Sequence, residues 1–303
     1  MATVSSSSAR LKFWGVRGSI PVPGPHTLRY GGNTTCVELR ADDEIVVLDA
    51  GSGIRPLGLA LQEEFGAEPI KVSLLISHLH WDHIQGFPFF QPAYHQNNQI
   101  HILGYDGAKN GLREMMATPF FPVKLSDLAS QIEIRKLEEM DFNIGKIRVR
   151  SRFLNHPGIC VGYHLFTTAG SVAFLPDNEP YDGLNLHMEN PPQAPEEIRK
   201  RAERERAGLV EFLHGADLLI LDTQYTDEEY QKHGGWGHGS LSTAVALATD
   251  AAVRKLILFH HDPEHSDEMV DQMVTKARAL ADKKGKLLEV IAAREGDEFL
   301  LGQ

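Results

Sequence analysis

The chain has 303 residues, of which 42% are hydrophobic and 23% are charged, the composition of an ordinary soluble globular protein. Its formal net charge of −11 disfavours a long polyanion such as nucleic acid as its partner. Its two cysteines, Cys36 and Cys160, lie far apart in the sequence and argue against a disulfide framework or a cysteine metal site.

The amino-terminal segment 1–10 is rich in serine and has no apolar core, so we expect it to be a disordered tail. No stretch of the chain approaches the length of a membrane span. The sequence therefore favours a cytoplasmic protein that does not bind a membrane.

The first quarter of the chain predicts short strands and one helix. A loop rich in proline and glycine, 18–25, follows the first apolar segment, and a helix cannot continue through it. The first apolar segment is 11–16. The expected strands are 36–40, 44–48 and 71–77, and the expected helix is 54–65.

Three histidines and an aspartate follow the last of these strands within six residues. His78 and His80 are two positions apart on an extended segment, so their side chains project to the same side and can share one metal ion. Asp82 and His83 come after the turn and can hold a second ion nearby. A chance histidine-rich loop is the alternative, but this spacing directly behind a buried strand favours a metal site.

The rest of the chain alternates strands with helices in an α/β pattern. A connection rich in proline, asparagine and glycine, 178–195, is long and indicates a surface excursion or lid. The expected strands are 99–104, 131–137, 146–153, 160–168, 171–175, 217–221, 255–259, 286–292 and 298–301. The expected helices are 109–116, 196–214, 240–253 and one that Ser266 caps and that ends near Gly285.

Further polar side chains stand where predicted strands end. His156 and Asp177 follow two successive strands, and the adjacent residues His260 and His261 follow a late one. Sheets of α/β proteins place their sites at such strand ends. We therefore expect these residues to lie near the histidine-rich loop.

The order of these residues resembles that of the metallo-β-lactamase superfamily, from the turn at Asp49 and Gly51 to the late histidine. The resemblance covers nearly the whole chain and implies a four-layer αββα sandwich. It implies a single domain, 11–303, with a surface insertion near 178–215. It also implies a hydrolase with two divalent ions at the edge between the sheets. Zinc is the expected ion, and manganese or iron would also suit the carboxylates.

The same resemblance assigns the ligands by motif. Of the two late histidines, His260 is the first choice and His261 the second, because alternation along the preceding strand would point His261 away. The implied ligands are His78, His80 and His156 for one ion, Asp82, His83 and His260 for the other, and Asp177 as the bridge between them.

The opening Phe13–Pro21 and the later Asn33–Thr35 are similar to the start of the ribonuclease Z and phosphodiesterase branch. In that branch an acidic residue at a strand end orients a histidine from a later loop, and Asp222 and His238 match those positions. His238 would then be a proton donor. The chain departs from ribonuclease Z in having Asp for Glu and an extra Gly239. The alternative is that His238 only caps the following helix.

His156 and Asp177 are 21 positions apart, which leaves no room for the tRNA-gripping arm that ribonuclease Z carries there. The sequence thus favours a phosphodiesterase for a small substrate, with cyclic nucleotides among the candidates, in which Asp82, Asp222 and His238 act in catalysis. The alternatives are a ribonuclease Z-like endonuclease, a lactone or thioester hydrolase, and a metal-binding module without catalysis. A homodimer is compatible with the sequence.

Overall fold

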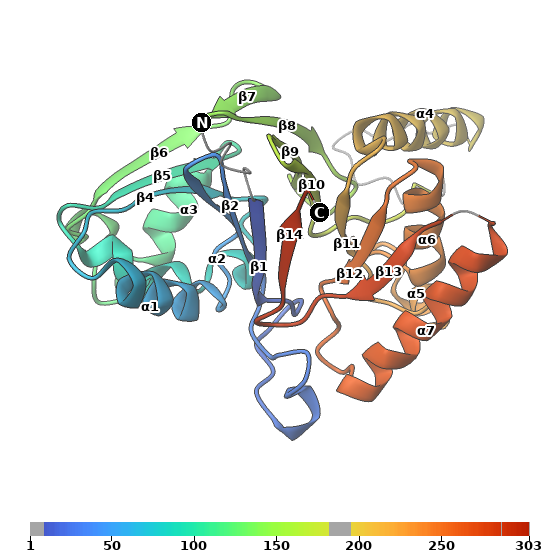
Figure 1. The fold of residues 1–303 in the computed structure, drawn as a ribbon, viewed down its shortest axis with the longest axis horizontal. Coiled ribbons are helices and arrows are strands. Elements are labelled where there is room, and N and C mark those ends of the chain that lie inside the picture. Colours follow the sequence, from blue (N-terminus) through green and yellow to red (C-terminus); the bar gives the residue numbers. More distant parts are fainter. Residues whose placement is uncertain (1–8, 182–194, 286, 303) are drawn as a thin grey trace, which may run out of the picture.

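The computed structural model describes residues 9–181, 195–285 and 287–302, which form two seven-stranded mixed β-sheets. The sheets face each other, and helices cover their outer faces (Figure 1). This is the four-layer αββα sandwich that the sequence predicted.

The first sheet has the strand order β14-β1-β2-β3-β4-β5-β6. Neighbours from β3 to β6 pair in parallel, so these strands end at the same edge of the sheet. The strands are β1 (Ala9–Gly15), β2 (Cys36–Ala41), β3 (Glu44–Leu48), β4 (Lys71–Leu75), β5 (Gln99–Gly104), β6 (Gln131–Lys136) and β14 (Glu298–Leu301).

The second sheet has the order β13-β12-β11-β10-β9-β8-β7. Neighbours from β10 to β13 are parallel, and those from β7 to β10 are antiparallel. The strands are β7 (Asp141–Ile144), β8 (Ile147–Phe153), β9 (Val161–Thr167), β10 (Gly170–Leu175), β11 (Leu218–Asp222), β12 (Lys255–Phe259) and β13 (Glu289–Ala292).

The helices divide between the two outer faces. Helices α1 to α3 lie on the side of the first sheet, and α4 to α7 lie on the side of the second (Figure 1). The helices are α1 (Ile54–Phe65), α2 (Trp81–Ile84), α3 (Ala108–Met115), α4 (Pro195–Leu213), α5 (Asp227–His233), α6 (Leu241–Asp250) and α7 (Asp267–Lys283).

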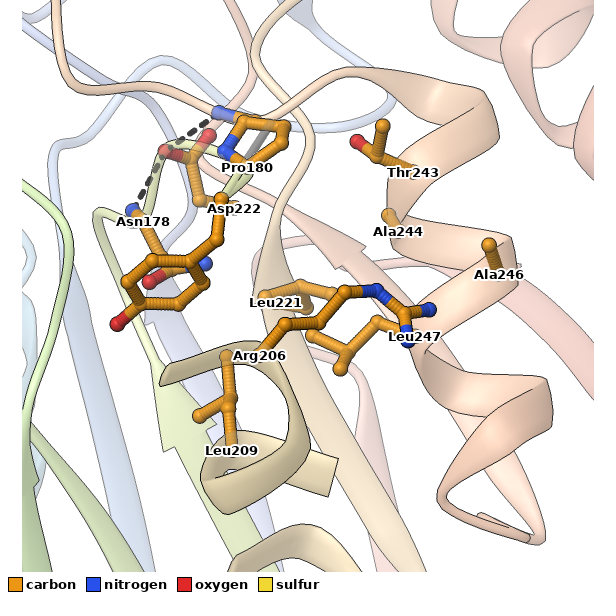
Figure 2. Close-up of a pocket in the computed structure, with 12 residues that line it drawn as sticks. Asn178, Pro180, Arg206, Leu209, Leu221, Asp222, Thr243, Ala244, Ala246 and Leu247 are labelled. Atoms are coloured by element: carbon orange, nitrogen blue, oxygen red, sulfur yellow. Dashed lines mark hydrogen bonds between the residues drawn. The ribbon is translucent and has the colours of Figure 1, made fainter. Parts of the chain in front are cut away.

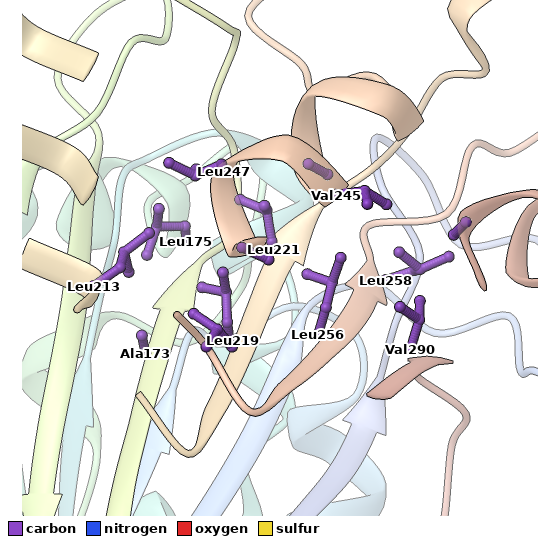
Figure 3. Close-up of a cluster of buried hydrophobic side chains, with 14 of the residues drawn as sticks. Ala173, Leu175, Leu213, Leu219, Leu221, Val245, Leu247, Leu256, Leu258 and Val290 are labelled. Carbon is purple, nitrogen blue, oxygen red and sulfur yellow. The ribbon is translucent and has the colours of Figure 1, made fainter. Parts of the chain in front are cut away.

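Strand β12 shows how alternation builds the layers. Ile257 and Phe259 are buried in the core between the two sheets. Leu256 and Leu258 point to the opposite face, where they pack in the core under the helices (Figure 3). Successive side chains of a strand point to opposite faces, so an apolar run such as this one indicates a strand covered on both sides.

The structure changes several predicted boundaries. Strand β1 begins at Ala9, so the last two residues of the predicted tail are ordered, and residues 1–8 lie outside the described residues. Residues 182–194 of the predicted surface insertion also lie outside them. Helix α4, in the same predicted insertion, buries Leu209 and Leu213 in the core under the helices and is therefore part of the outer helix layer.

Three short elements were not predicted, namely α2, β7 and α5. None has more than 7 residues, so apolar periodicity gives little signal for them. Where the structure is described, no helix is both long and apolar enough to cross a membrane.

Candidate metal centre

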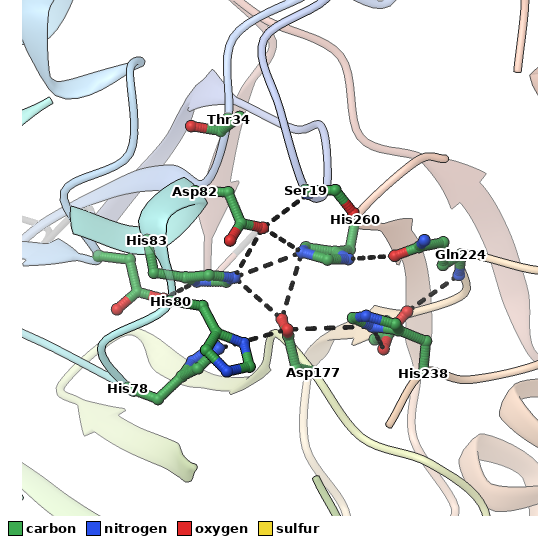
Figure 4. A network of polar contacts seen from close by, with 12 residues as sticks. Ser19, Thr34, His78, His80, Asp82, His83, Asp177, Gln224, His238 and His260 are labelled. Atoms are coloured by element: carbon green, nitrogen blue, oxygen red, sulfur yellow. Dashed lines mark hydrogen bonds and ion pairs between the residues drawn. The ribbon is translucent and has the colours of Figure 1, made fainter. Parts of the chain in front are cut away.

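All seven predicted ligands converge at the edge where strands of both sheets end (Figure 4). The loop after β4 and the single turn of α2 bring four of them from the first sheet. The other three follow strands of the second sheet. The four are His78, His80, Asp82 and His83, and the three are His156, Asp177 and His260.

One group of side chains consists of three histidines and Asp177, with ligand atoms within 4.8 Å of one another. His156 Nε2 lies 3.1 Å from His80 Nδ1. The Oδ2 atom of Asp177 lies 3.5 Å from His78 Nε2 and 3.6 Å from His156 Nε2. All but His80 are buried, so the group opens to solvent on the His80 side.

The second group consists of Asp82, His83 and His260, all buried. The two Nε2 atoms of the histidines are 3.3 Å apart, and Asp82 Oδ2 lies 3.2 Å and 3.1 Å from them. The other oxygen of Asp177, Oδ1, is 3.1 Å from His83 Nε2 and 3.3 Å from His260 Nε2. Asp177 thus turns one oxygen toward each group.

These distances fit divalent ions. Ligand nitrogens around a tetrahedral zinc ion are about 3.3 Å apart, given Zn–N bonds of about 2.0–2.1 Å. Two buried atoms in the cluster, His78 Nε2 and Asp177 Oδ1, have no hydrogen-bond partner among the described residues. Buried polar atoms are normally paired, so an orphaned pair in a histidine cluster indicates a cation as the partner.

Electrostatics also favours a cation. Burial lowers the pKa of His78 well below its usual value and that of His156 to about 4, which leaves both rings in the neutral form that binds metals. Burial disfavours charge on His83 too, but the carboxylates of Asp177 and Asp82 outweigh it and raise its pKa well above the usual value. Carboxylates that hold a proton there would equally hold a metal ion.

The outward-facing ring nitrogens have partners that fix how the rings point. His83 Nδ1 is 2.8 Å from Asp49 Oδ2, His260 Nδ1 is 3.0 Å from Gln224 Oε1, and His156 Nδ1 is 2.8 Å from the Gly237 carbonyl. Such contacts set the tautomer and orientation of metal-binding histidines. The prediction did not include Asp49 or Gln224 among the site residues. The turn after β3 that contains Asp49 was part of the resemblance, so the sequence held a signal for this residue. No sequence pattern marks Gln224.

His260, and not His261, reaches the other ligands. His261 instead turns its Nε2 to the carbonyl of Ala293 at 2.9 Å, and burial lowers its pKa to about 3. His260 has a φ of 61°, so the backbone has already left the strand at this residue. The predicted first choice therefore faces the cluster, although strand alternation is not what directs it there.

The opening segment Phe13–Pro21 contributes residues to the same site. The Ser19 N–H donates to Asp82 Oδ2 at 2.7 Å. A Cβ atom on Gly18 would lie 2.5 Å from the His260 ring, so this close approach requires glycine. The buried Arg17 donates to the carbonyls of Gly31 and His265 at 2.8 and 2.7 Å, which anchors the loop.

His238 and Asp222 form the predicted pair beside the cluster. His238 Nδ1 lies 3.0 Å from Asp222 Oδ2 and 3.9 Å from Asp177 Oδ2, and its ring stacks on His260 at 5.0 Å. Burial opposes protonation of His238, but Asp222 outweighs it and raises the pKa to about 9. The ring contacts the site, and the N-cap position of α6 is Ser240 and not His238.

Two pockets adjoin these residues. A cleft of about 450 Å³ is lined by His78 and His80 together with apolar residues that include Leu79, Tyr105 and Ile159. Another, of about 140 Å³, lies behind Asp222 between α4 and α6 and reaches none of the seven ligands (Figure 2). The cleft beside His80 is therefore the better candidate for binding a substrate.

Comparisons with known proteins agree with this geometry. Residues 45–261 match the model of the family described as Beta-lactamase superfamily domain. A ribonuclease Z of Thermoplasma acidophilum is 25% identical over 296 residues, which cover 88% of this chain and 90% of that protein.

Solved structures show the same fold. The metallo-β-lactamase fold protein YhfI of Bacillus subtilis superimposes with a TM-score of 0.69 at 16% identity, covering 97% of this chain and 100% of that one. Unliganded yeast PDE1 gives a TM-score of 0.67 at 13% identity, covering 97% and 99%. The chain belongs to the metallo-β-lactamase superfamily of hydrolases, in its ribonuclease Z-like branch.

Proposed function

We propose that the protein is a phosphodiesterase that uses two divalent ions and acts on a small phosphodiester, with cyclic nucleotides as candidate substrates. The observation that carries this proposal is the His238–Asp222 pair, which lies at the edge of the metal-ligand cluster. Hydrolysis of an alkyl phosphodiester expels an alkoxide, which must take up a proton, and a histidine held by a carboxylate is suited to donate it.

The two ligand groups would each hold one ion, with Asp177 shared between them. Two such ions would supply Lewis acidity, which would activate a water molecule and stabilise the negative charge that builds on the phosphate oxygens. Asp82 and Asp177 offset part of the positive charge. The charge balance of the site then suits a substrate with one negative charge.

His238 would supply the proton. Asp222 accepts from Nδ1, which leaves the Nε2 proton of the imidazolium to be donated to the leaving oxygen. The side chain of His238 is 12% exposed, so it is within reach of a bound substrate. Asp222 is held in turn by the N–H groups of Asn178 and Gly239, both at 3.1 Å from its Oδ2.

The cleft beside His80 supports a small substrate. Its volume of about 450 Å³ is within the range of sites that bind small molecules. Among its described lining residues there is no lysine or arginine, and Asp106 is the one carboxylate. A long polyanion would need cationic partners for its phosphates, whereas a nucleoside needs apolar walls.

A ribonuclease Z-like endonuclease is the second candidate, because the similarity to a ribonuclease Z extends over most of both chains. Only 21 positions separate His156 from Asp177, which counts against an RNA-gripping arm at that place. Hydrolysis of a thioester at the same ions expels a thiolate, which needs no proton from the His238–Asp222 pair. A lactone expels an alkoxide, so the substrate panel has to separate that candidate.

One substrate panel separates these candidates. The metal-loaded protein is given bis(p-nitrophenyl) phosphate, 2′,3′-cyclic and 3′,5′-cyclic nucleotides, a tRNA precursor and several lactones. We expect turnover of the small phosphodiesters. Turnover of lactones alone would refute the proposal, and cleavage of the tRNA precursor at a higher kcat/KM than any small diester would establish the second candidate.

A further inference from the structure

Glu179 is a fully buried carboxylate that lies two residues after Asp177 and belongs to none of the ligand groups. It faces the glycine-rich loop 233–239, which carries His238. The Gly235 N–H donates to its Oε1 at 2.6 Å, and the Gly237 N–H donates to its Oε2 at 3.1 Å. The Tyr230 hydroxyl, from α5, also donates to Oε1 at 2.9 Å.

The backbone of this loop depends on hydrogen bonds from other segments to keep one conformation. Gly235 and Gly237 have φ values of 90° and 91°, a region that glycine enters without steric cost and also leaves easily. Two carboxylates hold the loop on either side of His238. Glu179 binds the N–H groups that precede the histidine, and Asp222 binds the Gly239 N–H that follows it at 3.1 Å.

The same loop also contacts the metal centre. The Gly237 carbonyl accepts from His156 Nδ1 at 2.8 Å, and a Cβ on Gly237 would lie 2.3 Å from that nitrogen. The main chain of Glu179 is fixed to the segment that carries His156, since its N–H donates to the Asn155 carbonyl at 2.8 Å. Glu179 thus contacts the loop of His238 through its carboxylate and the segment of His156 through its main-chain N–H.

We propose that Glu179 is a positioning residue that holds the loop of residues 235–239, so that His238 faces the leaving oxygen. This inference rests on the proposed function for the role of His238. It adds a residue that sets the geometry of the proton donor without touching the substrate.

The test uses Glu179→Gln in the full-length, metal-loaded protein. A glutamine has the same shape, but it offers one acceptor oxygen, and its amide group donates and so cannot accept from the second glycine N–H. Glu229→Gln is the matched control, because Glu229 lies on α5 and its carboxylate contacts Thr226 and His265 instead. Tyr230→Phe removes one contact to Glu179 and is the milder second variant.

Two phosphodiesters that differ in the leaving group give the first readout. A p-nitrophenolate leaves with little help, whereas an alkoxide needs the proton. We expect Glu179→Gln to lower kcat for the alkoxide substrate by about 10² and for the aryl substrate by less than about threefold. Tyr230→Phe should show a smaller loss with the same selectivity, and Glu229→Gln should show none.

A double-variant cycle gives the second readout. Because both changes remove the same proton transfer, Glu179→Gln combined with His238→Ala should be no slower on the alkoxide substrate than His238→Ala alone. Equal losses on both substrates, or losses that multiply in the double variant, would overturn the positioning role.

Hydrogen exchange gives a third readout that does not depend on activity. The amides of residues 235–239 should exchange at least about tenfold faster in Glu179→Gln than in the wild type or in Glu229→Gln. Unchanged exchange would overturn the inference. Failure of the wild type to hydrolyse any phosphodiester, with faster loop exchange in Glu179→Gln, would instead refute the proposed function and leave the loop contact established.

Discussion

Asp49 and His83 form a fully buried hydrogen bond of 2.8 Å across 34 positions of sequence. Asp49 has a φ of 61° and also accepts from the Ser77 N–H and hydroxyl, both at 2.7 Å. The turn after β3 is thereby attached to the loop after β4. The bond leaves His83 Nε2 to face Asp82, Asp177 and His260.

Replacing Asp49 by Asn should weaken binding of the second ion. The amide cannot carry the charge that orients the His83 ring, and loss of such an outer contact lowers metal affinity by about 10- to 100-fold. Metal titration followed by calorimetry measures this. Asp43→Asn is the control, since that exposed side chain lies on the turn before β3. An unchanged affinity for both ions in Asp49→Asn would refute this role.

Removing the metal should lower thermal stability. The cluster buries Asp82 and Asp177 beside five histidines, and a bound ion stabilises only the folded chain, by about 2.7 kcal/mol at a concentration of 100 times its Kd. We expect a chelator to lower the Tm and re-addition of zinc or manganese to restore it. A Tm that does not respond to either treatment would contradict a metal centre at this place.

Replacing His238 by Ala should lower kcat by about 10² or more for a substrate with an alkoxide leaving group, with both ions retained. His238 is expected to act as an acid and not as a ligand that the ions require. His233→Gln is the matched control, because His233 is the last residue of α5 and its Nδ1 contacts the Glu229 carbonyl of the same helix instead. A kcat that stays the same would return His238 to a purely structural role.

The pH dependence of kcat should have an alkaline limb set by His238. A donor must be protonated, so activity is present below its pKa and is lost as the pH rises through it. Asp222 and the other carboxylates raise this pKa to about 9 against the effect of burial, and bound cations would oppose them and bring the limb below that value.

Asp222→Asn removes the main charge that favours the imidazolium, so the limb should move to lower pH. Measuring kcat as a function of pH for the wild type and this variant shows whether the limb moves. The assignment of the limb to His238 fails if His238→Ala keeps a limb of the same amplitude at the same pH.

The resemblance to a family named the seven candidate ligands, and the structure brings them together because each follows the end of a strand, directly or after a short turn. His78 and His80 are spaced to share an ion, and His156 and Asp177 end strands that the apolar pattern identifies. These strands reach one edge because parallel neighbours in a sheet end together. Secondary structure and topology alone therefore bring the ligands close.

The partners that orient the ligands were not predicted, for a different reason. Gln224 contacts His260 across 36 positions of sequence and Glu179 contacts Gly237 across 58, and no sequence periodicity records such contacts. The direction of His260 depends on a left-handed backbone at that residue, which strand alternation does not describe. These contacts and this backbone conformation depend on how distant segments pack in the folded chain.

The most direct test of the account titrates zinc or manganese into the metal-free protein while hydrolysis of bis(p-nitrophenyl) phosphate and of a lactone is followed in parallel. We predict that phosphodiesterase activity rises up to two equivalents per chain and then levels off, with no lactone turnover. Phosphodiesterase activity that is absent at every metal loading, with the lactone hydrolysed, would contradict the central claim.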